Sequence, residues 1–178
     1  MSFNFLNLEP PVRELMISEI EKDIENGKLY TSKRFTEEGK AAYPELLKEA
    51  ARTGTEESLA ESINKPEYFK DRELSTSKTG TTYSKDVSDI AYLTFAEGEF
   101  NKYYMRALCI RANTEHKSLE IYRAKEVDTS RAESASKIGD TIDPTAFLED
   151  LRNLETNNFK YPASGWSGGA NSGLSVKL

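Results

Sequence analysis

Two short patterns in the sequence have the residue types for acyl transfer by a serine. Residues 134–137 match S-x-x-K and residues 78–80 match K-T-G, the patterns in which serine β-lactamases and penicillin-binding proteins place their catalytic serine and lysines. In those enzymes K-T-G follows S-x-x-K, and S-D-N lies between them. Here K-T-G comes first, and no S-D-N lies between the two. Because patterns this short arise often by chance, we do not expect a serine enzyme.

The sequence lacks the ligand residues of a typical metal site. The chain has one histidine, His116, and one cysteine, Cys109, whereas zinc sites take three or four such ligands. Glu97 and Glu99 flank Gly98, but on a continuous helix they point about 200° apart and would share a metal only if Gly98 broke the helix. We expect Cys109 to pack as a small hydrophobe and His116 to lie on the surface or at a helix end. The sequence predicts no metal, no cofactor and no catalytic residue.

The glycine-rich stretch GWSGGANSG, residues 165–173, resembles a phosphate-binding loop in composition. A P-loop needs G-x-x-x-x-G-K-[ST] followed by a helix, because the lysine and the helix N-terminus bind the phosphates. No lysine follows here until Lys177, and no helical pattern follows at all. A hydrolase that uses carboxylates with Lys125 or Lys137 lacks a supporting D…[DE]-x-K arrangement. We therefore expect neither activity.

Basic and aromatic residues alternate between residues 102 and 131, a combination that binds single-stranded nucleic acid. They are Lys102, Tyr103, Tyr104, Arg106, Arg111, Tyr122, Arg123, Lys125 and Arg131. Acidic residues lie among and beside them, namely Glu97, Glu99, Glu115, Glu120, Glu126 and Asp128. The net charge of −6 gives no general attraction to a phosphate backbone. We therefore expect salt-bridged faces and no direct nucleic-acid binding.

Three helices are predicted near the N-terminus. Residues 11–27 carry apolar side chains at spacings of three and four, on one helical face. These are Val12, Leu15, Met16, Ile20 and Ile24. Thr36 is the expected cap of the next helix, in which Pro44 is expected to start a new helix or to cause a kink. Thr55 opens a third, short helix, and together the three predict an acidic helical unit.

The middle of the chain changes character twice. Residues 64–88 are rich in polar and turn residues and predict a long loop or a short hairpin around Gly80. Ser88 is the expected cap of the longest helix, which runs to about residue 115. Gly98 lies inside this helix at a cost of about 1 kcal/mol relative to alanine, so we expect it to mark a close helix crossing or a junction of two helices.

One strand and one helix are predicted in the following region. Residues 118–127, SLEIYRAKEV, predict a strand of about six residues. A single strand makes no sheet, so its partner is expected to be the 64–88 hairpin, the C-terminal segment or another chain. Asp143 caps a further helix, with Pro144 as its first residue.

Residues 157–178 depart from the helical pattern, since they are rich in glycine and serine and contain no aspartate or glutamate. They nevertheless hold the only tryptophan of the chain, Trp166, and end in a strand-like alternation of apolar residues. We predict an extended C-terminal arm that docks on a partner by strand addition and apolar anchoring. The predicted partner-binding residues are Phe159, Tyr161, Trp166, Leu174, Val176 and Leu178. Trp166 is expected to be buried against another chain or against the back of its own domain.

Length and composition predict one mainly α domain, α+β at most, with one or two short strands. The chain has 178 residues, of which 37% are hydrophobic and 30% charged. It divides into an N-terminal arm at 1–10, a helical domain at 11–156 with a loop at 64–88, and the C-terminal arm at 157–178. The N-terminus has no basic, apolar leader, and no apolar run is long enough to span a membrane. We therefore expect a cytoplasmic protein without a membrane anchor.

Five motifs lie between residues 99 and 174: EFNKYYMRALC, YRAK, ESASKIG, DPTAFLEDLR and NSGL. With the N-terminal stretch EIEKDIENGKLY they extend over most of the chain outside residues 64–88. They resemble the motifs of a family of small uncharacterised proteins from prophages, tailed phages and bacterial genomes, cyanobacteria among them. One position departs from the family pattern, because Ala170 stands where proline usually precedes NSGL. The resemblance implies a phage context and no established activity.

The sequence predicts a virion protein and not an enzyme. This prediction rests on the missing catalytic constellation, the acidic helical body, the unpaired strand and the terminal arm, together with the resemblance. We expect an oligomeric structural component of the head or neck of a tailed-phage particle, such as a capsid decoration, cement or connector protein, assembled in the host cytoplasm. Its partners would be other virion proteins or copies of itself. The alternative is a soluble phage-encoded regulatory or host-directed binding module.

Overall fold

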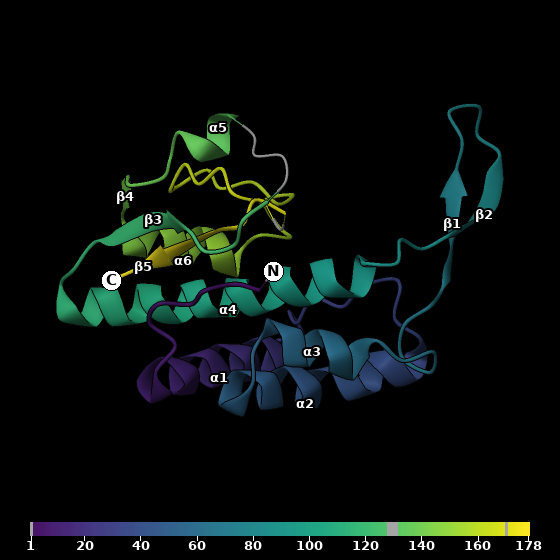
Figure 1. Ribbon diagram of the computed structural model, residues 1–178, viewed down its shortest axis with the longest axis horizontal. Helices are drawn as coiled ribbons and strands as arrows, with labels where there is room; N and C mark the ends of the chain where they lie inside the picture. The colour runs from purple at the N-terminus through teal and green to yellow at the C-terminus, as the bar shows by residue number, and fades with distance from the viewer. Residues whose placement is uncertain (1, 128–131, 170) are drawn as a thin grey trace.

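The fold is built around one long helix that lies between two layers. The computed structural model describes residues 2–127, 132–169 and 171–178. Its helices are α1 (Pro10–Glu25), α2 (Glu37–Thr53), α3 (Glu56–Ile63), α4 (Ala91–Glu115), α5 (Ala132–Ala135) and α6 (Pro144–Arg152). Helix α4 runs through the middle, with α1, α2 and α3 on one side and α6 with a small sheet on the other (Figure 1). The predicted helix-dominated α+β fold is confirmed.

Short strands form two separate antiparallel sheets in the described residues, where the sequence predicted one or two strands. The strands are β1 (Arg72–Thr76), β2 (Thr82–Asp86), β3 (Leu119–Arg123), β4 (Thr141–Ile142) and β5 (Leu174–Lys177). β1 and β2 pair with each other, and β3 lies between β4 and β5. The strand predicted within residues 118–127 thus pairs with the C-terminal segment, which is one of its three predicted partners.

The N-terminal helices begin at the predicted caps. Thr36 accepts a hydrogen bond from the Gly39 N–H at 3.0 Å, and Thr55 forms a capping box with Ser58. Pro44 lies inside α2 and does not start a new helix. Buried apolar side chains before and after this proline pack on the core, and they hold both halves of α2 in one element.

Helix α4 begins later than the sequence predicted. Ser88 is not its cap, because the helix starts after Ile90, which makes no side-chain capping bond. Ser88 contributes its backbone carbonyl instead, which accepts a hydrogen bond from the Ala91 N–H at 2.9 Å. The helix continues through Gly98 and ends at His116, whose φ of 56° is left-handed. The predicted helix end at His116 is confirmed. Of the two expectations for Gly98, a close helix crossing or a junction of two helices, the junction is wrong.

A buried ion network joins α1, α4 and α6. Arg106 donates to Glu19 at 2.8 and 2.6 Å and to Asp23 at 2.6 and 3.1 Å. Arg152 of α6 donates to the same Glu19 at 2.9 and 2.6 Å. Each buried charge has an opposite partner, whereas loss of one partner would leave a costly unpaired charge. The network therefore fixes how these three helices pack.

The first residues, predicted as a separate arm, lie across α4 and connect the two layers (Figure 1). The Phe3 N–H donates to Glu56 on α3 at 2.7 Å, and the Asn4 N–H donates to the Ala124 carbonyl beside β3 at 2.7 Å. The rings of Phe3 and Phe5 are stacked with centroids 5.3 Å apart. This segment thus closes the outer face of α4.

The β1–β2 hairpin projects from the helical body (Figure 1). Its five residue pairs run from Arg72 opposite Asp86 to Thr76 opposite Thr82. Gly80 lies in the turn with a φ of 86°, a conformation that favours glycine. The hairpin predicted around this glycine is therefore confirmed.

Candidate functional site

Residues 157–178 fold back on their own domain, and a buried carboxylate anchors them. Asp150 near the end of α6 accepts hydrogen bonds from the Ala163 N–H at 3.2 Å and from the N–H and Oγ of Ser164 at 2.7 and 2.6 Å. Hydrogen bonds to an ionised acceptor are stronger than neutral ones. The turn that precedes the tryptophan is therefore held at a fixed place against α6.

Trp166 packs beside α6 and is 7% exposed. Its ring centroid lies 4.9 Å from that of Phe147 and 6.4 Å from that of Tyr161. The indole N–H donates to the Gly168 carbonyl at 2.7 Å. A Cβ on Gly168 would lie 2.4 Å from the indole ring, so this close approach requires glycine.

Strand β5 is tied to α4 by a buried amide. The Asn101 Nδ2 donates to the Leu174 carbonyl at 2.9 Å, and the Ser175 Oγ donates to the Asn101 Oδ1 at 2.7 Å. Leu174 and Val176 are buried in the same core as α4. The predicted strand-like alternation at the C-terminus is thus confirmed as β5, which is part of this chain's own sheet.

The six predicted partner-binding residues lie in different environments. Three are buried in this chain: Trp166, Leu174 and Val176. Two are half-buried: Tyr161 and Leu178. Phe159 is 59% exposed. Trp166 was predicted to pack against another chain or against its own domain, and the structure shows it against its own domain. The segment does not reach away from the domain, because buried polar groups on α4 and α6 bind its backbone and side chains, which the sequence pattern does not reveal.

The fold-back forms one wall of a partly open cavity of about 300 Å³, here termed the aromatic pocket. It lies between α4, the end of α6, the loop at residues 30–34 and the C-terminal segment. The aromatic side chains that line it are Tyr30, Phe95, Phe159, Tyr161 and Trp166. Concave, largely apolar cavities with a few polar groups are the usual form of small-molecule sites. The aromatic pocket is therefore the candidate binding site of the described structure.

Small residues at helical spacing form part of the α4 side of the aromatic pocket, beside larger residues of the same helix such as Phe95 and Met105. Ala91, Thr94 and Gly98 line the pocket on one helix face, since residues three and four apart lie on the same face. Gly98 leaves room there without interrupting the helix. This spacing was a signal available in the sequence. The aromatic residues of the pocket come from distant segments, and nothing in the sequence pattern showed that they meet.

Phe159 at the aromatic pocket is held by an unusual backbone conformation. Asn158 and Phe159 have φ values of 51° and 58°, in the left-handed region that residues other than glycine adopt at a cost. The Phe159 N–H donates to the Leu154 carbonyl at 2.7 Å, which holds this turn. The Phe159 ring meets Tyr30 edge-on, with centroids 6.0 Å apart.

The polar groups of the aromatic pocket are of two kinds. Glu99 and Lys102 form an ion pair at 2.6 Å and neutralise each other. The hydroxyls of Tyr30 and Tyr161 have no hydrogen-bond partner in the described part of the chain. Burial raises the pKa of both phenols, that of Tyr161 to about 12. Both hydroxyls are therefore neutral and can donate and accept hydrogen bonds.

The serine and lysine patterns singled out in the sequence do not meet. The Ser134 side chain is buried and donates to the Ser167 carbonyl at 3.4 Å, while Lys137 lies 3.9 Å from Asp140. Lys78 belongs to the hairpin turn, which lies far from α5 (Figure 1). The S-x-x-K and K-T-G stretches therefore do not form a common site.

The carboxylates and the cysteine considered for chemistry have structural partners. Glu97 pairs with Lys125, and Glu99 pairs with Lys102, on one continuous helix. Within residues 2–127, 132–169 and 171–178, no cluster of three His, Cys, Asp or Glu could hold a metal ion. Burial raises the pKa of the Cys109 thiol well above its ordinary value, so this side chain packs as the predicted small hydrophobe.

Several basic residues of the stretch that alternates with aromatics form ion pairs, whereas Arg123 donates to the Ser172 carbonyl at 3.1 Å. Arg106 lies in the buried ion network, and Arg111 donates to Glu115 at 2.7 Å. Lys102 pairs with Glu99. The predicted salt-bridged faces are thus confirmed for these residues. Arg131 lies outside the described residues, as does Ala170, which precedes the NSGL motif.

Comparison of the chain with protein-family models finds no match, and comparisons with curated proteins and with solved structures find none either. Among the described residues, no helix combines the length and the apolar character needed to cross a membrane.

Proposed function

We propose that the chain is a non-enzymatic structural component of a tailed-phage particle, associated with its head or neck, which contacts other virion proteins or copies of itself through the β1–β2 hairpin. The phage context, with assembly in the host cytoplasm, rests on the motif resemblance. The docking role rests on the hairpin. It replaces the C-terminal arm expected from the sequence, because that segment packs on its own domain.

The observation that carries the docking role is the exposure of the hairpin on both faces. Leu74 is 72% exposed and Tyr83 is 47% exposed. Leu74 lies opposite Ser84 and Tyr83 opposite Ser75, so the two apolar side chains point to opposite faces. No further strand pairs with the hairpin in the described part of the chain. Isolated two-stranded hairpins are marginally stable, and unpaired edges recruit other strands, which favours a covering partner.

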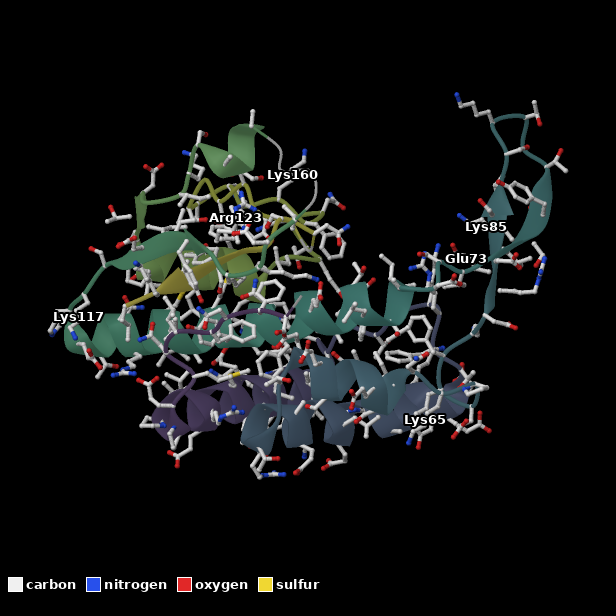
Figure 2. All side chains as sticks on the ribbon, in the orientation of Figure 1. Lys65, Glu73, Lys85, Lys117, Arg123 and Lys160 are labelled. Atoms are coloured by element: carbon white, nitrogen blue, oxygen red, sulfur yellow. The ribbon has the colours of Figure 1, made fainter. Side chains whose placement is uncertain are left out.

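The base of the hairpin is fixed to the helical body. Glu73 accepts hydrogen bonds from Arg34 at 2.9 and 3.1 Å and lies 3.3 Å from Lys85 (Figure 2). The Val87 N–H donates to the Asp71 carbonyl at 2.7 Å. The hydrogen bonds from Arg34 lower the pKa of Glu73 to about 2, so the pair is ionised at neutral pH. A hairpin fixed at its base presents its outer half in a defined direction, as specific docking requires.

Mass spectrometry of purified particles tests the proposed function. Tailed-phage particles are prepared from cells whose genome encodes the chain, and the chain is quantified against the major capsid protein. A fixed stoichiometry in repeated preparations is expected. Absence from the particles, with the protein present in the cell lysate, would contradict a structural role.

A paired substitution tests the hairpin as the docking element. Leu74→Ala combined with Tyr83→Ala is expected to lower incorporation into particles by about tenfold or more, because exposed apolar anchors dominate interface energies. The melting temperature should stay unchanged. Leu6→Ala combined with Ile138→Ala is the matched control, since it removes two exposed apolar side chains elsewhere. Equal losses for both pairs would exclude a specific role of the hairpin.

A soluble regulatory or host-directed binding module is the second candidate, and the aromatic pocket is the observation that favours it. In that case the chain would be recovered from infected cells as a monomer or dimer and would be missing from the particles. The particle analysis and the sedimentation of the lysate fraction therefore distinguish the two functions.

A further inference from the structure

We propose that the aromatic pocket binds a neutral, planar heteroaromatic small molecule of the size of a nucleobase. The pocket lies between α4 and the C-terminal segment. The proposal does not depend on the phage role, because it rests on the shape, charge and hydrogen-bonding groups of the pocket.

The shape of the pocket selects a flat ligand. On the α4 side, Ala91, Thr94 and Gly98 form a stretch without large side chains, which lies beside the larger Phe95 and Met105 of the same helix. The C-terminal segment contributes the rings of Tyr161 and Trp166. A flat molecule can stack on an aromatic ring while its other face lies on small residues. The volume of about 300 Å³ is at the lower end for small-molecule sites, which limits the ligand to one or two fused rings.

The charges of the pocket select a neutral ligand. Arg34, Glu99 and Lys102 line it, and each already has an opposite partner. Arg34 pairs with Glu73, and the other two pair with each other. A charged ligand would lose hydration on entry without gaining an unpaired counter-charge. A neutral ring avoids this loss.

The unpaired hydroxyls favour a ring with polar edge atoms. Tyr30 and Tyr161 line the pocket, and each phenol is neutral and without a partner in the described residues. Neither hydroxyl is among the fully buried polar atoms that lack a partner, so both are open to a molecule that enters the pocket. A heteroaromatic ring carries donors and acceptors that satisfy such groups, whereas a hydrocarbon ring of the same size does not.

Phe159 supplies further apolar surface for the ligand. Its ring is largely exposed, although the strained turn at Asn158 and Phe159 keeps it at the pocket. Strain of this kind persists where surrounding structure enforces it, and it gathers at binding sites. A bound ring would cover the exposed phenyl group and remove its surface from water.

The single tryptophan gives a direct readout of binding. The full chain is titrated with adenine, uracil and nicotinamide while the fluorescence of Trp166 is followed. We expect at least one ring to give a saturable change with a Kd between about 0.01 and 1 mM, the range that so small a ligand allows. Cyclohexanol, which is not planar, should give no saturable change, and adenosine monophosphate should bind at least about tenfold more weakly than adenine.

Two substitutions separate binding from folding. Gly98→Ala places a methyl group in the pocket and removes a glycine from a helix interior, so it should preserve thermal stability and weaken binding by about tenfold or more. Tyr161→Phe keeps the ring and removes the hydroxyl, which should weaken binding about threefold to tenfold. Tyr83→Phe on the hairpin is the matched control and should leave the titration unchanged.

Three outcomes would overturn the proposal: no saturable change with any of the three rings, an equal response to cyclohexanol, or binding that Gly98→Ala leaves intact. These outcomes do not bear on the phage role, which is read from particle incorporation of the hairpin variants. Failure of the ligand proposal and failure of the proposed function are therefore distinguishable.

Discussion

The β1–β2 hairpin and the C-terminal segment are alike in composition and differ in their packing. Both are rich in small polar residues and lack the helical period of the remaining chain. The hairpin projects from the body, whereas the C-terminal segment packs on α4 and α6 (Figure 1). The C-terminal segment has three large apolar side chains that reach the core, namely Trp166, Leu174 and Val176. The hairpin exposes one apolar side chain on each face, which is too little apolar surface to hold it against the body.

The two regions also differ in the buried polar groups that bind them to the rest of the domain. Asp150 and Asn101 bind the C-terminal segment from α6 and α4, and both are buried. The hairpin is bound at its base alone, through Glu73 and Arg34. A segment of low apolar content can thus pack on a domain when the domain supplies hydrogen-bond donors and acceptors for the backbone of the segment. Without them, the buried polar groups of the segment would be unpaired, which opposes packing.

The largest effect that we predict contrasts the two aromatic residues. Trp166→Ala should lower the free energy of unfolding by about 3–5 kcal/mol, because it removes a buried ring and leaves a cavity. Tyr83→Ala on the hairpin should change it by less than about 0.5 kcal/mol. Urea denaturation of the isolated chain measures both. The sequence predicts Trp166 as a partner-binding residue, whereas the burial of its ring within this chain gives it a part in the fold.

Acid is predicted to affect the body and the hairpin in different ways. Burial alone would raise the pKa of Glu19, but hydrogen bonds from Arg152, Lys22 and Arg106 lower it to about 2. The pKa of Glu19 in the folded chain is thus below the ordinary value of 4.5. The stability that the ionised Glu19 contributes is therefore fully present above pH 4.5 and is lost as the pH falls towards 2. The expected loss is up to about 3 kcal/mol of global stability, measured by denaturation between about pH 6 and pH 2.5.

At the hairpin, the same fall in pH should affect only local stability. The pKa of Glu73 is also lowered to about 2, first by the hydrogen bond from Arg34. Its protonation should speed amide hydrogen exchange at the base of the hairpin, relative to intrinsic rates, without changing global unfolding. Glu73→Gln should therefore leave the acid dependence of unfolding intact, whereas Glu19→Gln should reduce it. The reverse result would place the acid-sensitive contact of the fold in the hairpin.

The smallest predicted effect compares three glycines. Gly168→Ala should cost about 1–3 kcal/mol, because the new methyl group would displace the Trp166 ring. Gly169→Ala is the control, since a Cβ there would meet nothing within 4 Å, and it should be nearly neutral. Gly80→Ala should strain the hairpin turn without changing global stability, because Gly80 has a positive φ and the hairpin is not part of the core. Thermal denaturation of the three variants tests this order.

Local signals predicted most helices and their caps. The apolar face of α1, the caps Thr36, Thr55 and Asp143, and the hairpin turn at Gly80 follow from residue type and spacing. Ser88 was expected as a cap for the same local reason, yet it lies before the helix that it was expected to begin. A capping residue is useful only where the following turn is helical, and tertiary packing decides where that turn begins.

The sequence by itself determined a mainly helical domain, a terminal strand and a chain without a recognisable catalytic constellation, because these follow from periodicity and residue type within short windows. Only the tertiary structure decided where the C-terminal segment goes and what it encloses. Trp166, Tyr161 and Phe159 meet Tyr30 and Phe95 in one pocket, although more than sixty residues of sequence separate the two groups. Contacts between distant segments depend on the packing of all the elements between them, which no local pattern encodes.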